Sequence, residues 1–172
     1  MNYLDSHIHL SDDEYSNYIS HILFSLRCLK ITACSVTVNL ASSKRSLILF
    51  NTQKDIIIQF IGIHPEFAIN ENIEEFTEFF SSNLQHIDGI GEIGLDPTYI
   101  NQDEKQYSIQ KKTFQFLLEL AEKHNKPISI HSRKSLDDIL QILPSYNIKR
   151  SLLHWFNGSK KQLKQAMDMS IF

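Results

Sequence analysis

Histidine side chains occur in this sequence where short apolar segments end. His7 and His9 stand two residues apart in the segment Asp5-Ser6-His7-Ile8-His9. Side chains of a β-strand alternate between its two faces, so both imidazoles would point to one side, about 7 Å apart. Two ring nitrogens placed this way can converge on one cation. A metal site is one explanation of this pair, and for these two residues alone a chance pair in a partly buried strand is the slightly better one.

A carboxylate ends a second apolar segment, Gly89-Ile90-Gly91-Glu92-Ile93-Gly94-Leu95-Asp96. Glycines flank Glu92 and permit close approach of the backbone. A carboxylate in such a place is costly unless it is paired or coordinates a metal. Glu92 could also be an exposed residue of a turn, but the repetition of the pattern favours a ligand.

The pattern repeats at His131, which ends Pro127-Ile128-Ser129-Ile130-His131, and at His154, which ends Ser151-Leu152-Leu153-His154. A single histidine of this kind is more often a packing residue than a ligand. Parallel barrels, however, place their active sites at the carboxyl ends of the strands. Because ligand-type residues end the first, fourth, fifth and sixth such segments, we expect them to form a ring at one edge of a sheet.

The elements that would position these residues follow an alternating pattern. Short β-branched or apolar segments predict strands near residues 3–9, 32–38, 56–63, 87–92, 127–131 and 151–155. Each is followed by a stretch with helical spacing, and three stripes are clear: Ile19, Ile22, Leu23 and Leu26; Phe114, Leu117, Leu118 and Ala121; Leu136, Ile139, Leu140 and Leu143. Ser11 and Glu14 have the spacing of a capping box for the first helix, and the second helix should end near Asn125, before Pro127.

Six strand–helix units in series predict an α/β fold with a parallel sheet, because a parallel neighbour is reached through a crossover helix. This pattern leaves open a closed eight-stranded barrel and an open doubly wound sheet. Only five glycines and four prolines occur in 172 residues, and no linker interrupts the chain. We therefore expect a single domain over residues 1–172.

Charge and cysteine content bound the function. The formal net charge is −3, so no broad basic surface is available for nucleic acid, and contacts with phosphate should be local and assisted by cations. Two cysteines are too few for a disulfide framework, and no cationic leader precedes an apolar segment. No segment has the ~20 apolar residues that span a bilayer. These features predict a cytoplasmic protein with no membrane contact.

Taken together, the motifs resemble those of the TatD-like deoxyribonucleases, a family of the amidohydrolase superfamily of metal-dependent barrels. The matching segments run in the family's order over essentially the whole chain: His7-Ile8-His9, Gly62-Ile63-His64-Pro65, Gly91-Glu92-Ile93-Gly94-Leu95-Asp96, His131-Ser132-Arg133 and His154-Trp155-Phe156-Asn157-Gly158-Ser159. The resemblance implies a (β/α)8 TIM-type barrel, of which about six to seven βα units are present.

The resemblance also implies a site and a reaction. It assigns His7 and His9 to one divalent ion and His131 and His154 to a second, with Glu92 as the bridging, catalytic carboxylate. The ions would be zinc, magnesium or manganese, and a water activated by two metals would cleave the phosphodiester bonds of DNA.

Three further residues have two interpretations each. Arg133 resembles a phosphate-binding residue, since a guanidinium offers paired donors, but a solvated arginine is the alternative. His64 resembles a family position near the substrate, and a structural hydrogen bond would explain it equally well. Asp5 could orient a ligand histidine or cap backbone groups.

The family continues for about one more strand and its helices, and its metal-binding aspartate, which accepts a proton from the attacking water, has no counterpart here. Ser170-Ile171-Phe172 has the composition of the start of a seventh strand. The barrel is thus expected to be incomplete at its C-terminal end, with open edges that favour self-association or a protein partner. The chain would be a fragment, would be completed by a companion polypeptide, or would have lost catalysis.

Three functions follow from these expectations. The first is a metal-dependent nuclease that acts on DNA. The second is a catalytically impaired barrel that acts as a partner-binding subunit. The third is another reaction of the amidohydrolase type, such as deamination or lactone hydrolysis, because a fold does not fix a function.

Overall fold

The strands of this protein form one parallel sheet in sequence order. The computed structural model describes residues 3–101 and 103–172. Its six-stranded sheet has the order β1-β2-β3-β4-β5-β6, and each strand is parallel to its neighbours. The strands are β1 (Tyr3–Ile8), β2 (Ile31–Val36), β3 (Ile57–Ile61), β4 (Gly89–Gly94), β5 (Ile128–His131) and β6 (Ser151–Leu153). All six strands predicted from the sequence are present.

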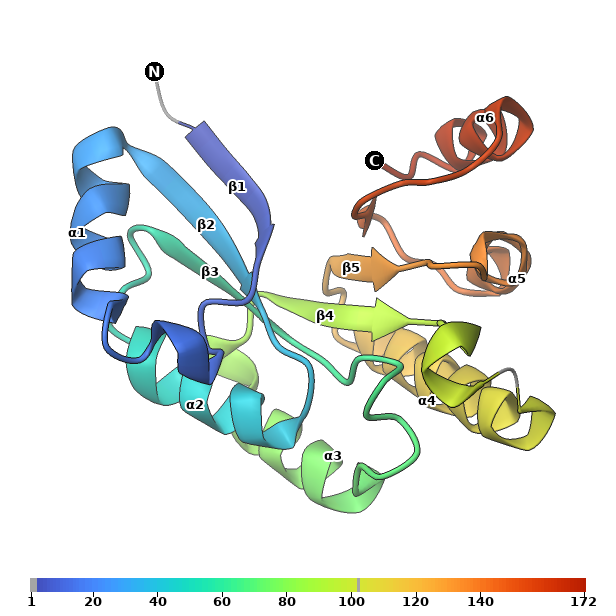
Figure 1. Cartoon of the computed structure of the whole chain (residues 1–172), viewed down its shortest axis with the longest axis horizontal. Coiled ribbons are helices and arrows are strands. Elements are labelled where there is room, and N and C mark those ends of the chain that lie inside the picture. Colours follow the sequence, from blue (N-terminus) through green and yellow to red (C-terminus); the bar gives the residue numbers. More distant parts are fainter. Residues whose placement is uncertain (1–2, 102) are drawn as a thin grey trace.

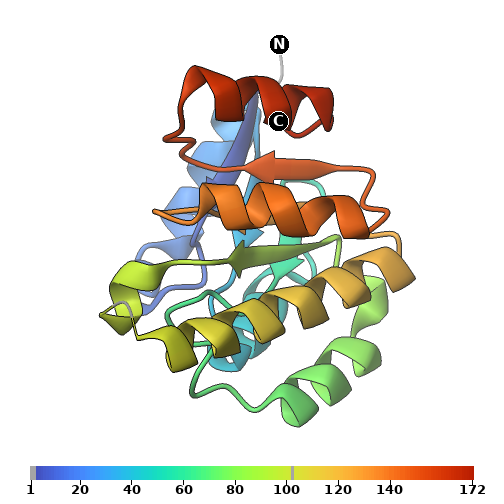
Figure 2. The same cartoon turned by 90° about the vertical axis from the view of Figure 1, so that its right-hand side faces the viewer.

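The helices alternate with the strands and lie outside the curled sheet (Figures 1 and 2). They are α1 (Ile19–Leu29), α2 (Leu40–Phe50), α3 (Ile73–Ser82), α4 (Glu104–Lys123), α5 (Leu136–Ile142) and α6 (Lys160–Asp168). Short 3-10 turns lie at Asp13–Tyr15, Leu84–His86, Pro97–Ile100 and Leu143–Ser145. Among the helices of the described residues, none combines the length and the apolar composition that crossing a bilayer requires.

Strand order decides between the two architectures that the sequence allowed. A doubly wound sheet reverses its strand order at a switch point, whereas a barrel adds each strand beside the previous one. The observed order is sequential, and the sheet curls with its helices outside. The chain therefore forms six βα units of a TIM-type barrel that does not close.

The main core lies between the outer face of the sheet and the helices. Ile90 and Ile93 of β4 belong to it, together with Phe76, Phe80 and Phe114, all of which are fully buried. The pairing of β4 with β5 shifts register between Ile90 and Ile93. Both isoleucines consequently face the helices although they are three residues apart, and Glu92 between them is left on the inner side. Replacing a buried phenylalanine such as Phe80 by alanine would cost about 3–5 kcal/mol of stability.

Helix boundaries follow local signals in most places. Asn39 and Ser42 form a capping box for α2, Ser159 and Gln162 form one for α6, and the Asp103 side chain accepts from the main-chain N–H of Gln106 in α4. As expected, α4 ends before Pro127: its last residue is Lys123, and Asn125 has a positive φ of 50°.

Two boundary predictions are wrong. Ser11 and Glu14 do not cap the first helix: a 3-10 turn occupies Asp13–Tyr15, and α1 begins at Ile19 without a side-chain cap. Leu143 belongs to a 3-10 turn rather than to α5. Pro144 follows it, and a proline cannot donate the hydrogen bond that continues an α-helix.

The residues predicted to begin a seventh strand do pair with β6. Ser151 and Ile171 form a parallel bridge, the N–H of Phe172 donates to the carbonyl of Ser151 over 3.0 Å, and the N–H of Leu153 donates to the carbonyl of Phe172 over 2.6 Å. They form an isolated bridge and no full strand within the described residues.

Candidate metal centre

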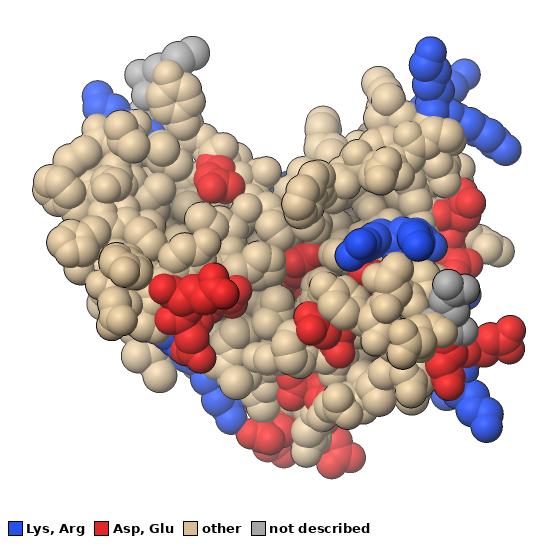
Figure 3. Space-filling view, viewed as in Figure 1, with Lys and Arg blue, Asp and Glu red and all other residues tan. Residues whose placement is uncertain are grey.

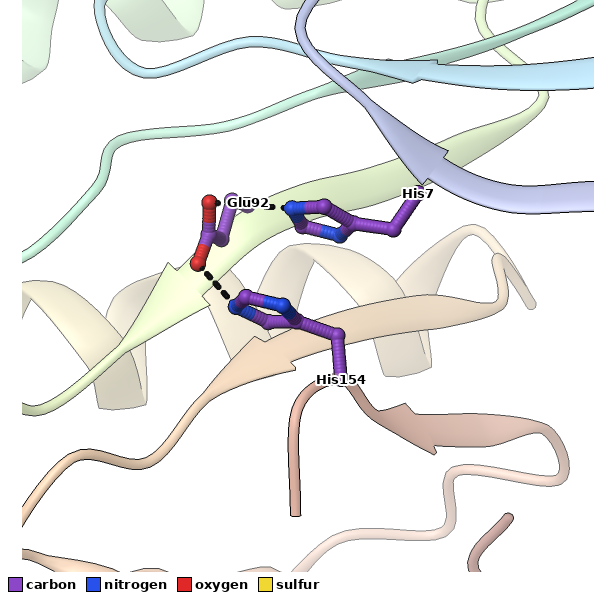
Figure 4. Close-up of side chains that lie close together, drawn as sticks. All are labelled: His7, Glu92 and His154. Carbon is purple, nitrogen blue, oxygen red and sulfur yellow. Dashed lines mark hydrogen bonds and ion pairs between the residues drawn. The ribbon is translucent and has the colours of Figure 1, made fainter. Parts of the chain in front are cut away.

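The carboxyl ends of the strands bring the predicted ligands together from distant parts of the sequence. His7 is in β1 and His9 follows it, Glu92 is in β4, His131 ends β5, and His154 follows β6. Figure 4 shows the carboxylate of Glu92 between the imidazoles of His7 and His154. All five side chains meet at one mouth of the curled sheet.

Glu92 is the centre of this cluster, and its side chain is only 2% exposed. Its Oε2 lies 3.3 Å from Nε2 of His7 and 3.1 Å from Nε2 of His9. Its Oε1 lies 2.8 Å from Nδ1 of His131 and 2.5 Å from Nε2 of His154. Each carboxylate oxygen therefore faces a different pair of histidines, which is the arrangement that a bridging carboxylate requires.

The rings also approach one another across these pairs. His7 and His154 stack with their centroids 3.8 Å apart and an interplanar angle of 5°. Donor atoms of His7, Glu92 and His154 lie within 4.8 Å of one another, as do those of His64, Glu92 and His131. The geometry thus offers more than one way to divide the ligands between ions, and the predicted division stays a prediction.

Burial and hydrogen bonds shift the pKa values of this cluster. Burial raises the pKa of Glu92, but hydrogen bonds from His131, His154, His7 and His9 outweigh it and hold the pKa far below its usual range. Burial lowers the pKa of His7 and outweighs the attraction of Glu92. Burial also lowers the pKa of His9, but the hydrogen bond and the charge of Glu92 outweigh it and raise the pKa above the ordinary value. The same holds for His131, whose pKa is raised by both Glu92 and Asp96.

This donor set fits a divalent cation. Within residues 3–101 and 103–172, the ion pairs of Glu92 are with histidines only. A buried carboxylate surrounded by imidazoles needs positive charge, which either protons on the rings or a cation can supply. Imidazole nitrogen and carboxylate oxygen suit zinc and manganese.

His64 lies in the loop after β3, and its side chain is 7% exposed. Its Nδ1 accepts a hydrogen bond from the main-chain N–H of Glu66 over 3.2 Å, so a neutral ring carries its proton on Nε2. This Nε2 lies 3.3 Å from Nδ1 of His131 and 3.8 Å from Oε1 of Glu92. Burial lowers the pKa of His64 to about 4. His64 is therefore arranged as a neutral donor that points into the centre. To act as a ligand in the group with Glu92 and His131, it would have to give up the proton on Nε2.

Arg133 lies at the rim, in the loop after β5, and is exposed. Among the described residues, no carboxylate forms an ion pair with its guanidinium. Arg133 follows His131 by two residues, and within the described ranges no hydrogen bond or ion pair joins its side chain to the five clustered side chains. Its predicted phosphate-binding role remains a prediction.

Asp5 caps the backbone and leaves the ring of His7 to another residue. Its Oδ1 accepts from the main-chain N–H of His7 over 3.1 Å. Nδ1 of His7 instead lies 3.0 Å from the hydroxyl of Ser129, a buried residue of β5. Gly91 of β4 lies against this serine: a Cβ added at Gly91 would lie 2.8 Å from the Cβ of Ser129, so only glycine fits at position 91. Of the two predicted roles of Asp5, the structure shows the backbone cap.

Asp96 received no role from the sequence. It is fully buried after β4, and its Oδ2 lies 2.8 Å from Nε2 of His131. The only signal available was its place in the quoted segment, four residues after Glu92. Ser129 gave no signal, because a serine in an apolar strand is unremarkable until its neighbour across the sheet is known.

Comparison with known proteins shows a family, sequence relatives and solved structures that resemble this chain. The family described as "TatD related DNase" matches residues 4–172. The uncharacterized metal-dependent hydrolase YabD of Bacillus subtilis is 27% identical over 172 residues, which cover 98% of this chain and 66% of that protein. The chain thus spans about two thirds of the length of this relative.

Two solved structures show the same fold at lower identity. The TatD homologue YJJV from Escherichia coli K12 aligns with a TM-score of 0.85 and 20% identity, over 98% of this chain and 66% of its own. A hydrolase of the TatD family from Entamoeba histolytica aligns with a TM-score of 0.84 and 22% identity, over 99% of this chain and 64% of its own.

Proposed function

The chain belongs to the TatD-related DNase family, and from this premise we propose that it is a metal-dependent hydrolase that cleaves phosphodiester bonds of DNA. The observation that carries the proposal is the arrangement around Glu92: one buried carboxylate presents each of its oxygens to two imidazoles. Such a site can hold two cations that share one bridging ligand.

The protein side chains would hold divalent ions and leave substrate contact to their neighbours. His7, His9, Glu92, His131 and His154 are the ligands we propose. Bound divalent ions supply Lewis acidity, which lowers the pKa of water and offsets the charge that develops on a phosphodiester. Glu92, whose pKa is held far below its usual range, stays ionised at neutral pH and keeps its negative charge at the centre.

The substrate would meet two donors at the mouth. The Nε2–H of His64 points into the centre, and its ring stays neutral near pH 7 because burial lowers its pKa to about 4. A neutral donor suits a phosphate oxygen without adding a fixed charge. The exposed guanidinium of Arg133 can form paired hydrogen bonds to phosphate. The net charge of −3 gives no broad basic surface, so recognition would be confined to this mouth.

Metal content and DNA cleavage test the proposal together. The purified chain should carry zinc or manganese by mass spectrometry, and it should cleave DNA with added manganese or magnesium. His131→Ala and Glu92→Ala should abolish cleavage, while Asp55→Asn should not, because Asp55 pairs with Arg27 at the surface. Cleavage that survives both substitutions would contradict the ligand assignment. Ester and amide probes cleaved in place of DNA would favour another amidohydrolase reaction.

A second candidate function rests on an exposed apolar face. Figure 3 shows a notch at the top of the molecule, bordered mainly by uncharged residues, between the parts that carry β1 and α6. Tyr3 and Leu4 are exposed on β1, and Met167 and Phe172 are exposed on the other side. This face would bind a second polypeptide. Light scattering should then show a concentration-dependent dimer or a stable complex, and a strictly monomeric protein would contradict it.

A further inference from the structure

Asp96 holds the far side of the His131 ring. It is fully buried, and its Oδ1 accepts hydrogen bonds from the main-chain N–H and the hydroxyl of Thr98, over 2.8 and 2.6 Å. Its Oδ2 lies 2.8 Å from Nε2 of His131 and has no other partner among the described residues. The two donors of Thr98 satisfy one oxygen, so the second oxygen faces the histidine alone.

We propose that Asp96 is a positioning residue that keeps the proton of His131 on Nε2 and thereby directs the lone pair of Nδ1 toward Glu92. This inference rests on the proposed metal-dependent function. A neutral imidazole has one N–H and one lone pair, so the partner of one nitrogen decides what the other can do. Nδ1 of His131 is 2.8 Å from Oε1 of Glu92. Without an ion, the protonated ring donates from Nδ1 to Glu92. When Nδ1 gives up this proton, Asp96 retains the proton on Nε2, and the lone pair of Nδ1 lies beside Glu92, where an ion would be shared.

Gln110 fixes Asp96 in turn. This glutamine of α4 is fully buried, and its Oε1 accepts from the main-chain N–H of Asp96 over 3.1 Å. Its Nε2 donates to the carbonyl of Asp96 over 3.0 Å and to that of Pro65 over 3.1 Å. Pro65 follows His64, so one side chain ties the loops after β3 and β4 to the same helix. Gln110 thus links the loop that carries His64 to the residue that contacts His131.

The burial of Asp96 bears on why residue 96 is an aspartate. A carboxylate that is removed from water is costly unless its oxygens are paired. A residue that merely capped the turn at Pro97–Ile100 could do so with a neutral side chain of the same size, as asparagine does elsewhere. Only His131, the partner of the second oxygen, requires a full negative charge at Asp96.

The test uses Asp96→Asn, which keeps the size and removes the charge. Both donors of Thr98 require an oxygen where Oδ1 stands, so the new amide nitrogen must face Nε2 of His131. That nitrogen donates, and Nε2 must then carry the lone pair and Nδ1 the proton. Nitrogen-15 NMR of the chelator-treated protein should show a proton on Nε2 of His131 in the wild type and on Nδ1 alone in Asp96→Asn at high pH. Zinc affinity, measured by competition with a chelating dye, should fall about 10- to 100-fold.

Two controls separate positioning from folding. Thr98→Val retains the main-chain donor to Asp96 and should keep the proton on Nε2. Gln110→Met should weaken zinc binding more than Gln59→Met, because Gln59 is an equally buried glutamine that bonds Ser46 and the carbonyl of His86, away from the centre. Urea titrations would measure the free energy of unfolding of both variants, so that their zinc affinities are compared at a similar loss of stability.

A proton that stays on Nε2 of His131 in Asp96→Asn would overturn the inference. So would a zinc affinity that stays the same although the proton has moved to Nδ1. If Gln110→Met and Gln59→Met lower zinc affinity equally, Gln110 is structural only. A wild-type chain that binds no zinc, manganese or magnesium would overturn the proposed function, while the NMR reading of His131 would still decide whether Asp96 sets its proton.

Discussion

His131 and His9 both lie beside Glu92, but the protein holds them differently. The far nitrogen of His131 faces Asp96, which Thr98 and Gln110 hold in place. The side chain of His9 is 29% exposed, and its buried Nδ1 has no hydrogen-bond partner in residues 3–101 and 103–172. Equal ligand types thus differ in how completely their orientation is fixed before an ion arrives.

The supporting strands differ in the same way. The last residues of β5 lie between β4 and β6. In the part of the chain that the structure describes, β1 pairs with β2 alone and exposes Tyr3 and Leu4. A ligand fixed in advance loses little freedom when it binds, so it contributes more affinity. We therefore expect the β4–β5 side of the centre to supply most of the metal affinity, and the β1 side to respond most to the metal.

Glu92 belongs to both sides, and its removal should have the largest effect. Glu92→Gln replaces the single carboxylate of the ligand set with a neutral amide, so zinc should no longer bind measurably to either pair of histidines. Calorimetric titration with zinc would measure this, with Asp55→Asn as the control for a lost surface carboxylate. Retained binding would show that the two sides hold metal independently of Glu92.

Single histidine substitutions compare the sides directly. His131→Ala should weaken zinc binding about 100-fold, and His9→Ala only about tenfold, because the first ligand is fixed and the second is not. Dye competition would give both constants under the same conditions. Equal losses of zinc affinity would contradict the expected difference between the two sides. A larger loss for His9→Ala would show that the β1 side holds the metal more tightly.

Zinc should change the two sides unequally. An ion at 100 times its dissociation constant stabilises the folded chain by about 2.7 kcal/mol. The amides of β1 should gain more protection in hydrogen exchange than those of β5, because β1 has a neighbour on one side only and is tied to β4 through His7 and His9. Protection confined to β5 would contradict the weaker hold on β1.

The smallest effect concerns Cys34 of β2, the neighbour of β1. Cys34 is buried beside Val36 and Phe60, and burial raises the pKa of its thiol to about 11. The unfolded chain ionises first as pH rises above 9, so the thiol's contribution to stability is present below pH 9 and lost toward pH 11, at a cost of about 2 kcal/mol. Urea titrations of the wild type and Cys34→Val at pH 8.5 and 10.5 would measure it.

Cys28 provides an internal standard for the same edge. It is exposed, so a thiol reagent should label it at once, and labelling of Cys34 should require the sheet to open between β1 and β2. Fast labelling of both cysteines would show that this edge opens readily.

Local patterns predicted much of the fold. The strand segments and the stripes of α1, α4 and α5 are confirmed, apart from Leu143, because apolar spacing depends only on neighbours in the sequence. The prediction that Ser11 and Glu14 form a capping box is wrong. Their spacing fits such a box, but the helix that they would cap begins only at Ile19. The sequence also named the five side chains that meet at the mouth, since each one lies at or near the carboxyl end of a strand and parallel strands end at the same edge.

Only the tertiary structure decided how those side chains are held. Asp96 faces His131 across 35 residues of chain, and Ser129 faces His7 across 122. The periodicity of a strand tells which face a residue occupies, but not which residue of a distant strand lies opposite, because that depends on register. Register followed from the packing of the sheet against its helices, and so did the choice of a barrel over a doubly wound sheet.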